Sequence, residues 1–150
     1  MPKIVTADGG IREDHWVVVP HPAEGESLAL PTQPALIPVR LWLAGREHYA
    51  GREDIGVWFD SHEEPEMLAD RVNELPLIAV NFPKFSDGRG YSIARLLRER
   101  FGYRNELRAI GDVLLDQLQF MKRCGFDTYA LRPDKDFSKA GWSDFRDISN

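Results

Sequence analysis

The feature that most constrains this chain is a regular alternation of short apolar runs with longer amphipathic segments between residues 55 and 131. Two of the runs, Ile55–Phe59 and Leu77–Phe82, have the length of strands. The second is apolar at almost every position, as expected of a strand that is covered on both faces. Strands that alternate with helices along the chain predict βαβ units and a parallel sheet with right-handed crossovers.

The same patterns predict the individual elements, together with the Pro and Gly residues that begin and end helices. The expected strands are His15–Pro20, Ile55–Phe59, Leu77–Phe82, Leu107–Ile110 and Thr128–Leu131. The expected helices are Pro38–Tyr49, Glu64–Leu75, Tyr91–Phe101 and Asp112–Cys124. In the first helix, the alternation of Val39, Leu41 and Leu43 leaves a strand open as the alternative.

We therefore predict an α/β fold, with a mostly parallel sheet of about four to five strands and flanking helices. A length of 150 residues suits a single domain over residues 1–150. Residues 1–54 form its less regular part and residues 132–150 a polar tail, whose aromatic residues Phe137, Trp142 and Phe145 either pack on the domain or form a docking segment.

Composition excludes several classes of protein. No apolar stretch approaches the ~20 residues of a membrane span, and the N-terminus is not typical of a signal peptide, so we expect a cytoplasmic protein. A single cysteine, Cys124, forms neither an internal disulfide nor a dithiol redox pair, and we expect it to be buried. The four histidines lack metal-ligand spacing, so no metal or cofactor is expected.

The net charge of −5 conceals a basic segment. Between Arg89 and Arg108 there are six arginines and two acids, which makes this segment +4 and the remainder −9. An acidic chain argues against general nucleic-acid binding, whereas a local basic strip suits an anionic ligand or an acidic partner. The alternative is that these arginines form only a solvated helix face and bind no ligand or partner.

The candidate binding site lies in a loop after an expected strand, because ligands of parallel sheets bind beyond the carboxyl ends of the strands. The same rule names the loops Asp60–His62, Gly111–Asp112 and Arg132–Asp134. The richest loop runs from Asn81 to Ser92 and leads into a helix, whose N-terminal N–H groups favour anions. Its candidate anion-binding residues are Lys84, Ser86, Gly88, Arg89, Gly90 and Ser92.

This loop also has structural explanations. Asp87-Gly88 is a common turn sequence, Asp87 or Ser92 suits a helix cap, and Arg89 suits an ion pair with Asp112. Asp87 and Asp112 are the candidates for a catalytic base, although no nucleophile and base can be paired by spacing. Asp112 and Asp116 lie one helical turn apart and either interact with the helix dipole or hold a proton or cation.

Three segments resemble a bacterial family of small uncharacterised proteins: FPKFSDGRGYSIARLLRER (82–100), ELRAIGDVLLDQL (106–118) and MKRCGFDTYAL (121–131). The resemblance covers residues 55–131. Members of that family are commonly encoded beside assimilatory sulfite reductase and are often labelled probable oxidoreductases. The resemblance implies an accessory role in sulfite reduction, by docking to the reductase, cofactor delivery or regulation. The alternative is an enzyme or sensor that binds a sulfur-assimilation anion at residues 81–92.

Overall fold

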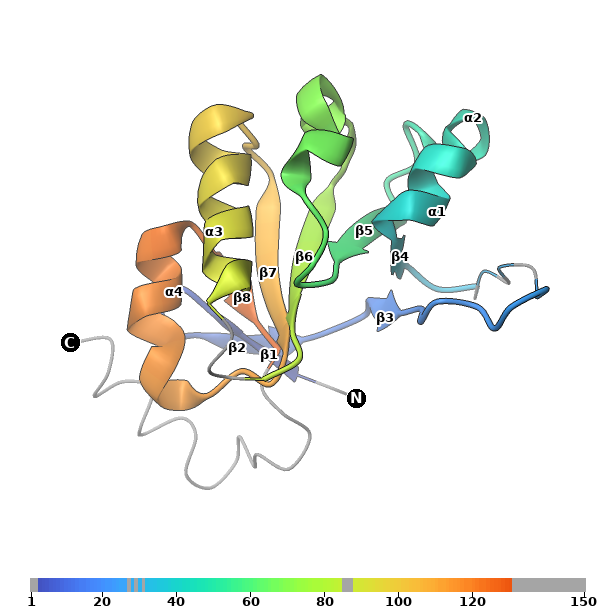
Figure 1. Cartoon of the computed structure of the whole chain (residues 1–150). Coiled ribbons are helices and arrows are strands. Elements are labelled where there is room, and N and C mark those ends of the chain that lie inside the picture. The colour runs from blue at the N-terminus through green and yellow to red at the C-terminus, as the bar shows by residue number, and fades with distance from the viewer. Residues whose placement is uncertain (1–2, 27, 29, 31, 85–87, 131–150) are drawn as a thin grey trace.

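The fold was analysed in a computed structural model of the chain, which describes residues 3–26, 28, 30, 32–84 and 88–130 (Figure 1). The strands are β1 (Lys3–Thr6), β2 (Ile11–Glu13), β3 (Val17–Val18), β4 (Ala35–Pro38), β5 (Ile55–Phe59), β6 (Leu77–Phe82), β7 (Glu106–Gly111) and β8 (Thr128–Tyr129). The α-helices are α1 (Val39–Ala44), α2 (Arg46–Tyr49), α3 (Arg89–Arg95) and α4 (Leu118–Cys124). Short 3₁₀ turns occupy η1 (Pro65–Met67), η2 (Ala69–Glu74) and η4 (Leu115–Gln117), and η3 (Leu96–Arg100) continues α3 as a π-helical turn.

The strands of the described residues form one eight-stranded mixed sheet in the order β2-β1-β8-β7-β6-β5-β4-β3. Neighbours from β3 to β8 are parallel, whereas β1 is antiparallel to both β2 and β8. The prediction of a mostly parallel sheet with four or five strands was therefore wrong. The α/β class and the parallel βαβ part are present, but the N-terminal third adds β1, β2 and β4 to the sheet.

The connection between β2 and β3 shows that this sheet is strongly curled. The two strands lie at opposite edges, yet only Asp14, His15 and Trp16 join them. A chain of this length spans at most ~14 Å. In a flat eight-stranded sheet, neighbouring strands ~4.8 Å apart would place the edges roughly 33 Å from each other. The strands therefore curve into a half-barrel, with the short connection on its concave side.

The helices cover only one face of this half-barrel (Figure 1). Sequential order of the parallel strands explains this, because right-handed crossovers between successive neighbours all fall on the same side. The larger core cluster lies between helices and sheet, where Val57 and Val80 pack with Leu97 and Met121. A smaller cluster lines the opposite, inner face, and its members are Leu36, Trp58, Leu77, Ala79 and Ile110, with Trp16 packed against them.

Several predicted helices are shorter than expected. Residues 64–75 form two 3₁₀ helices rather than one α-helix. The positive φ of 52° at Ala69 is incompatible with a continuous right-handed helix at that residue. Residues 38–49 divide at Gly45 into α1 and α2, and the preceding segment Ala35–Pro38 is a buried strand. The helix predicted from Asp112 begins as α4 only at Leu118. The predicted strands 55–59 and 77–82 are confirmed to the residue.

The remaining predictions concern Cys124, the C-terminal residues and membrane-spanning segments. Cys124 is buried, as expected, and packs in the larger core cluster. The loop Arg132–Asp134, the end of the predicted strand at Leu131 and the aromatic residues of the tail lie outside the described residues. No helix of the described residues is long and apolar enough to cross a membrane.

Candidate functional site

The carboxyl ends of β5 and β6 bring together a polar pair on the inner side of the half-barrel. Asp60 directly follows β5, and Asn81 is the last inner-facing residue of β6. The Asn81 Nδ2 donates a hydrogen bond to Asp60 Oδ1 at 3.3 Å, and the Ser61 N–H donates to the same oxygen at 2.9 Å. This is the edge at which enzymes with parallel strands place their reacting groups. The sequence analysis predicted both loops as candidate sites, but it did not predict that the side chains of Asp60 and Asn81 form a hydrogen bond.

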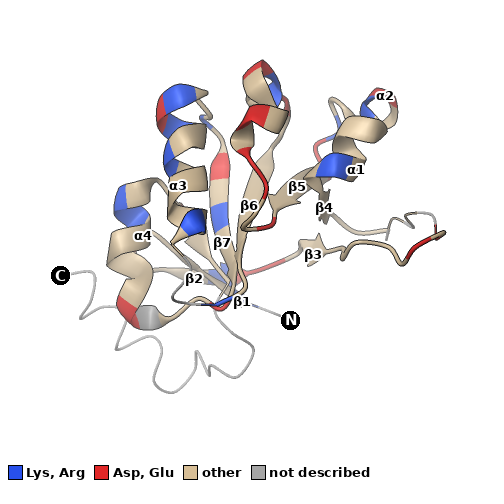
Figure 2. Cartoon of the chain, viewed as in Figure 1, with Lys and Arg blue, Asp and Glu red and all other residues tan. Residues whose placement is uncertain are grey.

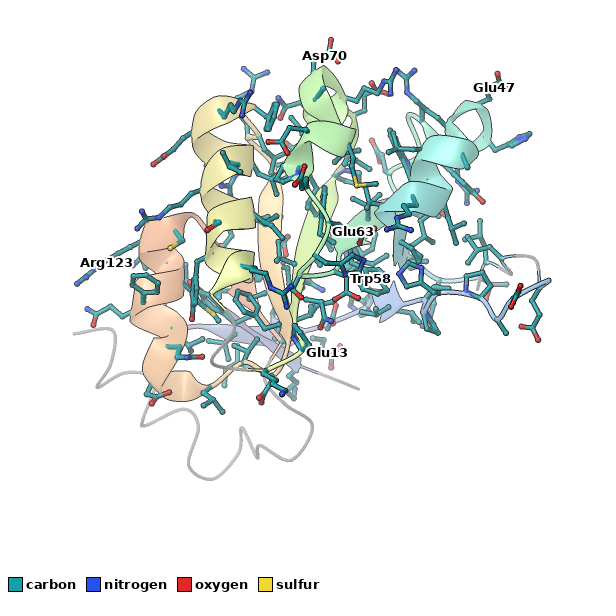
Figure 3. The ribbon with its side chains drawn as sticks, in the orientation of Figure 1. Glu13, Glu47, Trp58, Glu63, Asp70 and Arg123 are labelled. Atoms are coloured by element: carbon teal, nitrogen blue, oxygen red, sulfur yellow. The ribbon has the colours of Figure 1, made fainter. Side chains whose placement is uncertain are left out.

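A buried glutamate fixes the loop that carries Asp60. The Glu63 side chain is only 1% exposed, and its Oε2 lies 3.2 Å from the Nε of Arg40 on α1. Its Oε1 accepts a hydrogen bond from the Asp60 N–H at 2.7 Å. Figure 3 labels Glu63 in this loop after β5, near Trp58. The loop is therefore held to α1 by charge and to its own backbone by a hydrogen bond, which positions Asp60 beside Asn81.

A glycine lets the end of β7 approach this pair closely. Gly111 has a φ of +91°, and a Cβ there would lie 2.3 Å from Asn81 Oδ1 and 2.5 Å from the carbonyl oxygen of Phe82. Both the backbone conformation and the lack of space require glycine. Asp112 then returns to β6 by donating its N–H to the Phe82 carbonyl at 2.7 Å.

The predicted anion loop is described only in part. Lys84, Gly88, Arg89 and Ser92 are exposed, whereas Ser86 and Asp87 lie outside the described residues. Gly90 is buried, and its position requires glycine for packing, because a Cβ would lie 2.5 Å from the Phe82 ring. The N-cap of α3 is Gly88 and carries no side-chain cap, so Ser92 does not cap this helix. Anion binding by this loop stays a prediction.

The candidate pair of Asp112 and Asp116 does not share a helix. Asp112 lies between β7 and η4, while Asp116 belongs to η4 and is exposed. The expectation that both stand on the first turn of one helix was wrong, because the chain bends at Asp112 and helical structure begins only at Leu115. Within the described chain, no three His, Cys, Asp or Glu side chains are grouped to hold a metal ion.

The predicted basic strip divides into structural and exposed arginines. Arg98 in η3 donates to the carbonyl oxygens of Gly125, Tyr103 and Asn105 and forms a 2.6 Å ion pair with Asp127. It therefore joins η3 to the segments that precede β7 and β8. Arg108 lies inside the half-barrel and is 2% exposed. The exposed members are Arg89, Arg95, Arg100 and Arg104.

The outer surface of α3 and α4 combines exposed basic residues with an aromatic pair. Figure 2 shows basic positions along both helices. We call it the α3–α4 face and define it by Tyr91, Arg95, Phe120, Lys122 and Arg123. The rings of Tyr91 and Phe120 meet edge to face with centroids 4.7 Å apart, and Phe120 is 45% exposed. In Figure 3, Arg123 extends from α4 away from the sheet. An exposed large aromatic side chain among arginines is typical of a protein-binding surface.

A charged cluster inside the half-barrel was missed by the sequence analysis. Arg108 on β7 donates to Asp14 Oδ1 at 2.7 Å, to Glu106 Oε2 at 2.9 Å and to Thr128 Oγ1 at 3.1 Å. Burial alone would raise the pKa of Glu106, but Arg108 and hydrogen bonds from Arg12, Thr128 and Arg108 lower it below its usual value. The signal was the polar alternation of Glu106 and Arg108 on an otherwise apolar strand.

This cluster lies beside a pocket of about 500 Å³ that Arg12, Asp14, His15 and Trp16 line. Its cations are already matched by Asp14 and Glu106, both within 2.9 Å of Arg108. The cluster therefore holds the connection between β2 and β3 against β7.

The model of the family described as bacterial protein of unknown function (DUF934) matches residues 56–149, which is more than half of the chain. The chain belongs to this family. The matched range contains β6 to β8, all of β5 except Ile55, the α3–α4 face and the Asp60–Asn81 pair. Neither the curated proteins nor the solved structures contain a match.

Proposed function

We propose that this member of the DUF934 family is an accessory protein of assimilatory sulfite reduction that docks on sulfite reductase through its α3–α4 face. The resemblance of residues 82–131 to proteins encoded beside sulfite reductase supports the metabolic context. The exposed Phe120, in edge-to-face contact with Tyr91 and flanked by basic side chains, is the observation that carries the docking role.

The side chains of the α3–α4 face indicate what kind of partner surface it would bind. Aromatic and arginine side chains contribute most of the binding energy at protein interfaces, because they bury a large area or form several hydrogen bonds at once. Arg95, Lys122 and Arg123 add positive charge around the ring pair. The partner surface on the reductase therefore carries acidic residues around an apolar hollow, and opposite charges accelerate the encounter.

The carboxyl-end site supports a binding or catalytic function less well. The Asp60 carboxylate is 28% exposed there and would repel an anion placed against the ends of β5 and β6. An anion at residues 81–92 would depend on Lys84 and Arg89 instead. The docking role does not require this chemistry, which is why we favour it over an anion enzyme or sensor.

Binding to purified sulfite reductase from the same bacterium tests the proposal. We expect a complex whose dissociation constant rises at least about tenfold in Phe120→Ser and in Arg123→Glu, the second with a reduced dependence on salt. Arg52→Glu makes the same charge change at an arginine paired with Asp54, outside the α3–α4 face, and should bind as the wild type does.

The proposal fails if no complex forms at tens of micromolar protein and a deletion strain reduces sulfite normally. It also fails if Arg52→Glu weakens binding as much as Arg123→Glu, because attraction would then depend on total charge rather than on this face.

A further inference from the structure

The segment that follows β8 carries three aromatic side chains that take no part in the α3–α4 face. We call it the post-β8 segment and define it as residues 131–150, which lie outside the described residues. Its rings belong to Phe137, Trp142 and Phe145. The match to the DUF934 family continues through residue 149, so nearly all of this segment belongs to the sequence that the family shares.

The post-β8 segment is too short and too polar to bury these rings within itself. Eight of its residues are charged, and its length is far below the ~40 residues under which a chain needs disulfides, metals or oligomerisation to fold. Burial of a large aromatic ring is nevertheless strongly favourable. The rings can therefore be buried only against apolar surface from outside the segment, which either the described domain or another molecule supplies.

The described domain offers these rings little apolar surface. Val18 and Phe120 are the only large hydrophobic side chains that are exposed among the described residues, at 42% and 45%. Val18 belongs to β3 at one end of the sheet, whereas α4, which carries Phe120, precedes β8 toward the other end. Two separate side chains do not form a face for three rings, so a partner molecule is the better receptor.

The post-β8 segment begins at the edge of the sheet where α3 and α4 also begin (Figure 1). Ala130, which directly precedes it, donates its N–H to the carbonyl oxygen of Ala109 in β7 at 2.9 Å, and β7 and β8 run parallel. Ala130 therefore lies at the carboxyl edge, from which the chain enters α3 after β6 and α4 after β7. Tyr91 and Phe120 are the third residues of these two helices, so the aromatic pair lies near the same edge.

We propose that the post-β8 segment makes a second contact on the partner that the α3–α4 face binds, with Trp142 and Phe145 as its anchors. Trp142 comes 12 positions after Ala130, a length that spans up to ~43 Å when extended, so a partner that covers Phe120 is within reach. Trp142 and Phe145 are three positions apart, a spacing at which two side chains enter one groove when a segment binds as a helix. The partner therefore presents an apolar groove beside the acidic surface that receives the α3–α4 face. This second contact depends on the proposed docking function.

The charge of the post-β8 segment distinguishes its contact from that of the α3–α4 face. Its four basic residues and four acidic residues balance: Arg132, Lys135, Lys139 and Arg146 against Asp134, Asp136, Asp144 and Asp147. A segment without net charge gains little from long-range attraction, so its contribution comes from ring burial and changes little with salt. Because the segment is tethered to the docking face, even a weak contact of its own strengthens the complex.

Binding of the full chain to purified sulfite reductase, measured at two salt concentrations, tests the second contact. Trp142→Ser should raise the dissociation constant about tenfold or more, because an anchoring ring is lost. Its salt dependence should stay that of the wild type, whereas Arg123→Glu reduces the salt dependence. Ser143→Ala changes the neighbouring position without removing a ring, so it is the matched control and should bind as the wild type does.

Hydrogen exchange of the same complex gives an independent measurement. The amide groups of residues 137–147 should exchange more slowly in the complex than in the free chain, because binding orders and covers them. The second contact is overturned if this exchange is unchanged, or if Trp142→Ser binds as tightly as Ser143→Ala. Tighter binding of Trp142→Ser than of the wild type also overturns it, because the rings would then compete with the partner for the α3–α4 face. In all three cases a weakened Phe120→Ser complex still supports the docking function, whereas no complex with the wild type refutes both.

Discussion

Replacing Asp14 by alanine tests whether the buried charged cluster holds the two edges of the curled sheet together. Asp14 belongs to the three-residue connection between β2 and β3, and its side chain is 12% exposed. Its Oδ1 accepts hydrogen bonds from Arg108 Nη1 at 2.7 Å and from the Trp16 N–H at 3.0 Å. The substitution removes the oxygen that accepts both hydrogen bonds and leaves the rest of the cluster in place.

The expected loss of stability follows from these two contacts. Arg108 keeps Glu106 and Thr128, so the change leaves one buried N–H group of a charged side chain without its partner, which costs about 1–3 kcal/mol. The loss of the acceptor for the Trp16 N–H adds about 1 kcal/mol. We therefore expect the free energy of unfolding to fall by about 2–4 kcal/mol. At this chain length the melting temperature should fall by roughly 5–15 °C.

Urea unfolding followed by tryptophan fluorescence measures this loss, and Trp16 provides a probe next to the substitution. Asp54→Ala is the matched control, because it breaks an ion pair with Arg52 in which both side chains are nearly half exposed. Its cost should stay within about 0.5 kcal/mol. If Asp14→Ala were as stable as the control, the cluster would not hold the connection between β2 and β3 against β7.

Three further predictions concern the same region and the carboxyl-end site. The pKa of Glu106 is lowered in the folded protein, so its stabilising effect is present above the usual pKa of 4.5 and is lost as pH falls through the lower, folded value. Urea unfolding between pH 3 and 7 should show the stability difference between wild type and Glu106→Gln shrinking toward the acid end, and a constant difference would contradict this. Gly111→Ala should cost more than about 2 kcal/mol, since its Cβ would lie 2.3 Å from Asn81 Oδ1, whereas Gly51→Ala, with a φ of +84° and open space, should cost only about 1 kcal/mol. Equal melting temperatures for the two alanine variants would show that the strand ends move apart freely. Asn81→Leu should leave the Asp60 carboxylate without its amide donor and reduce stability by about 1 kcal/mol, which thermal unfolding would detect.

The parts of the fold with a local signal could be predicted from the sequence. The runs Ile55–Phe59 and Leu77–Phe82 were located to the residue, because a fully buried parallel strand is a continuous apolar run bounded by turns. β1 and β2 were missed because they are short, with four and three residues, and because β1 joins the sheet through the distant β8. Val5 pairs with Tyr129, a partner that no pattern within the first residues indicates. β4 was missed because prolines surround it, and Pro38 was interpreted only as a helix start.

The candidate site shows the same limit. The rule for parallel sheets named the loops after β5 and β6, and the Asp60–Asn81 pair lies at their start. Local spacing could not show that Asn81 reaches Asp60. Arg108 was grouped with the other arginines by its position in the chain, although alternation places it on the inner side of β7, away from the basic surface.

The pairing of the first strand with the last has a consequence for synthesis on the ribosome. β3 to β7 can each be added beside the strand made just before, so this part of the sheet grows as the chain emerges. The hairpin of β1 and β2 is made first but finds its place only after Thr128 and Tyr129 of β8 have left the exit tunnel. Until then the backbone edges of both the hairpin and β7 are unpaired, and such edges invite contact with other chains. A nascent chain stalled before Thr128 should therefore be the most aggregation-prone form of this protein.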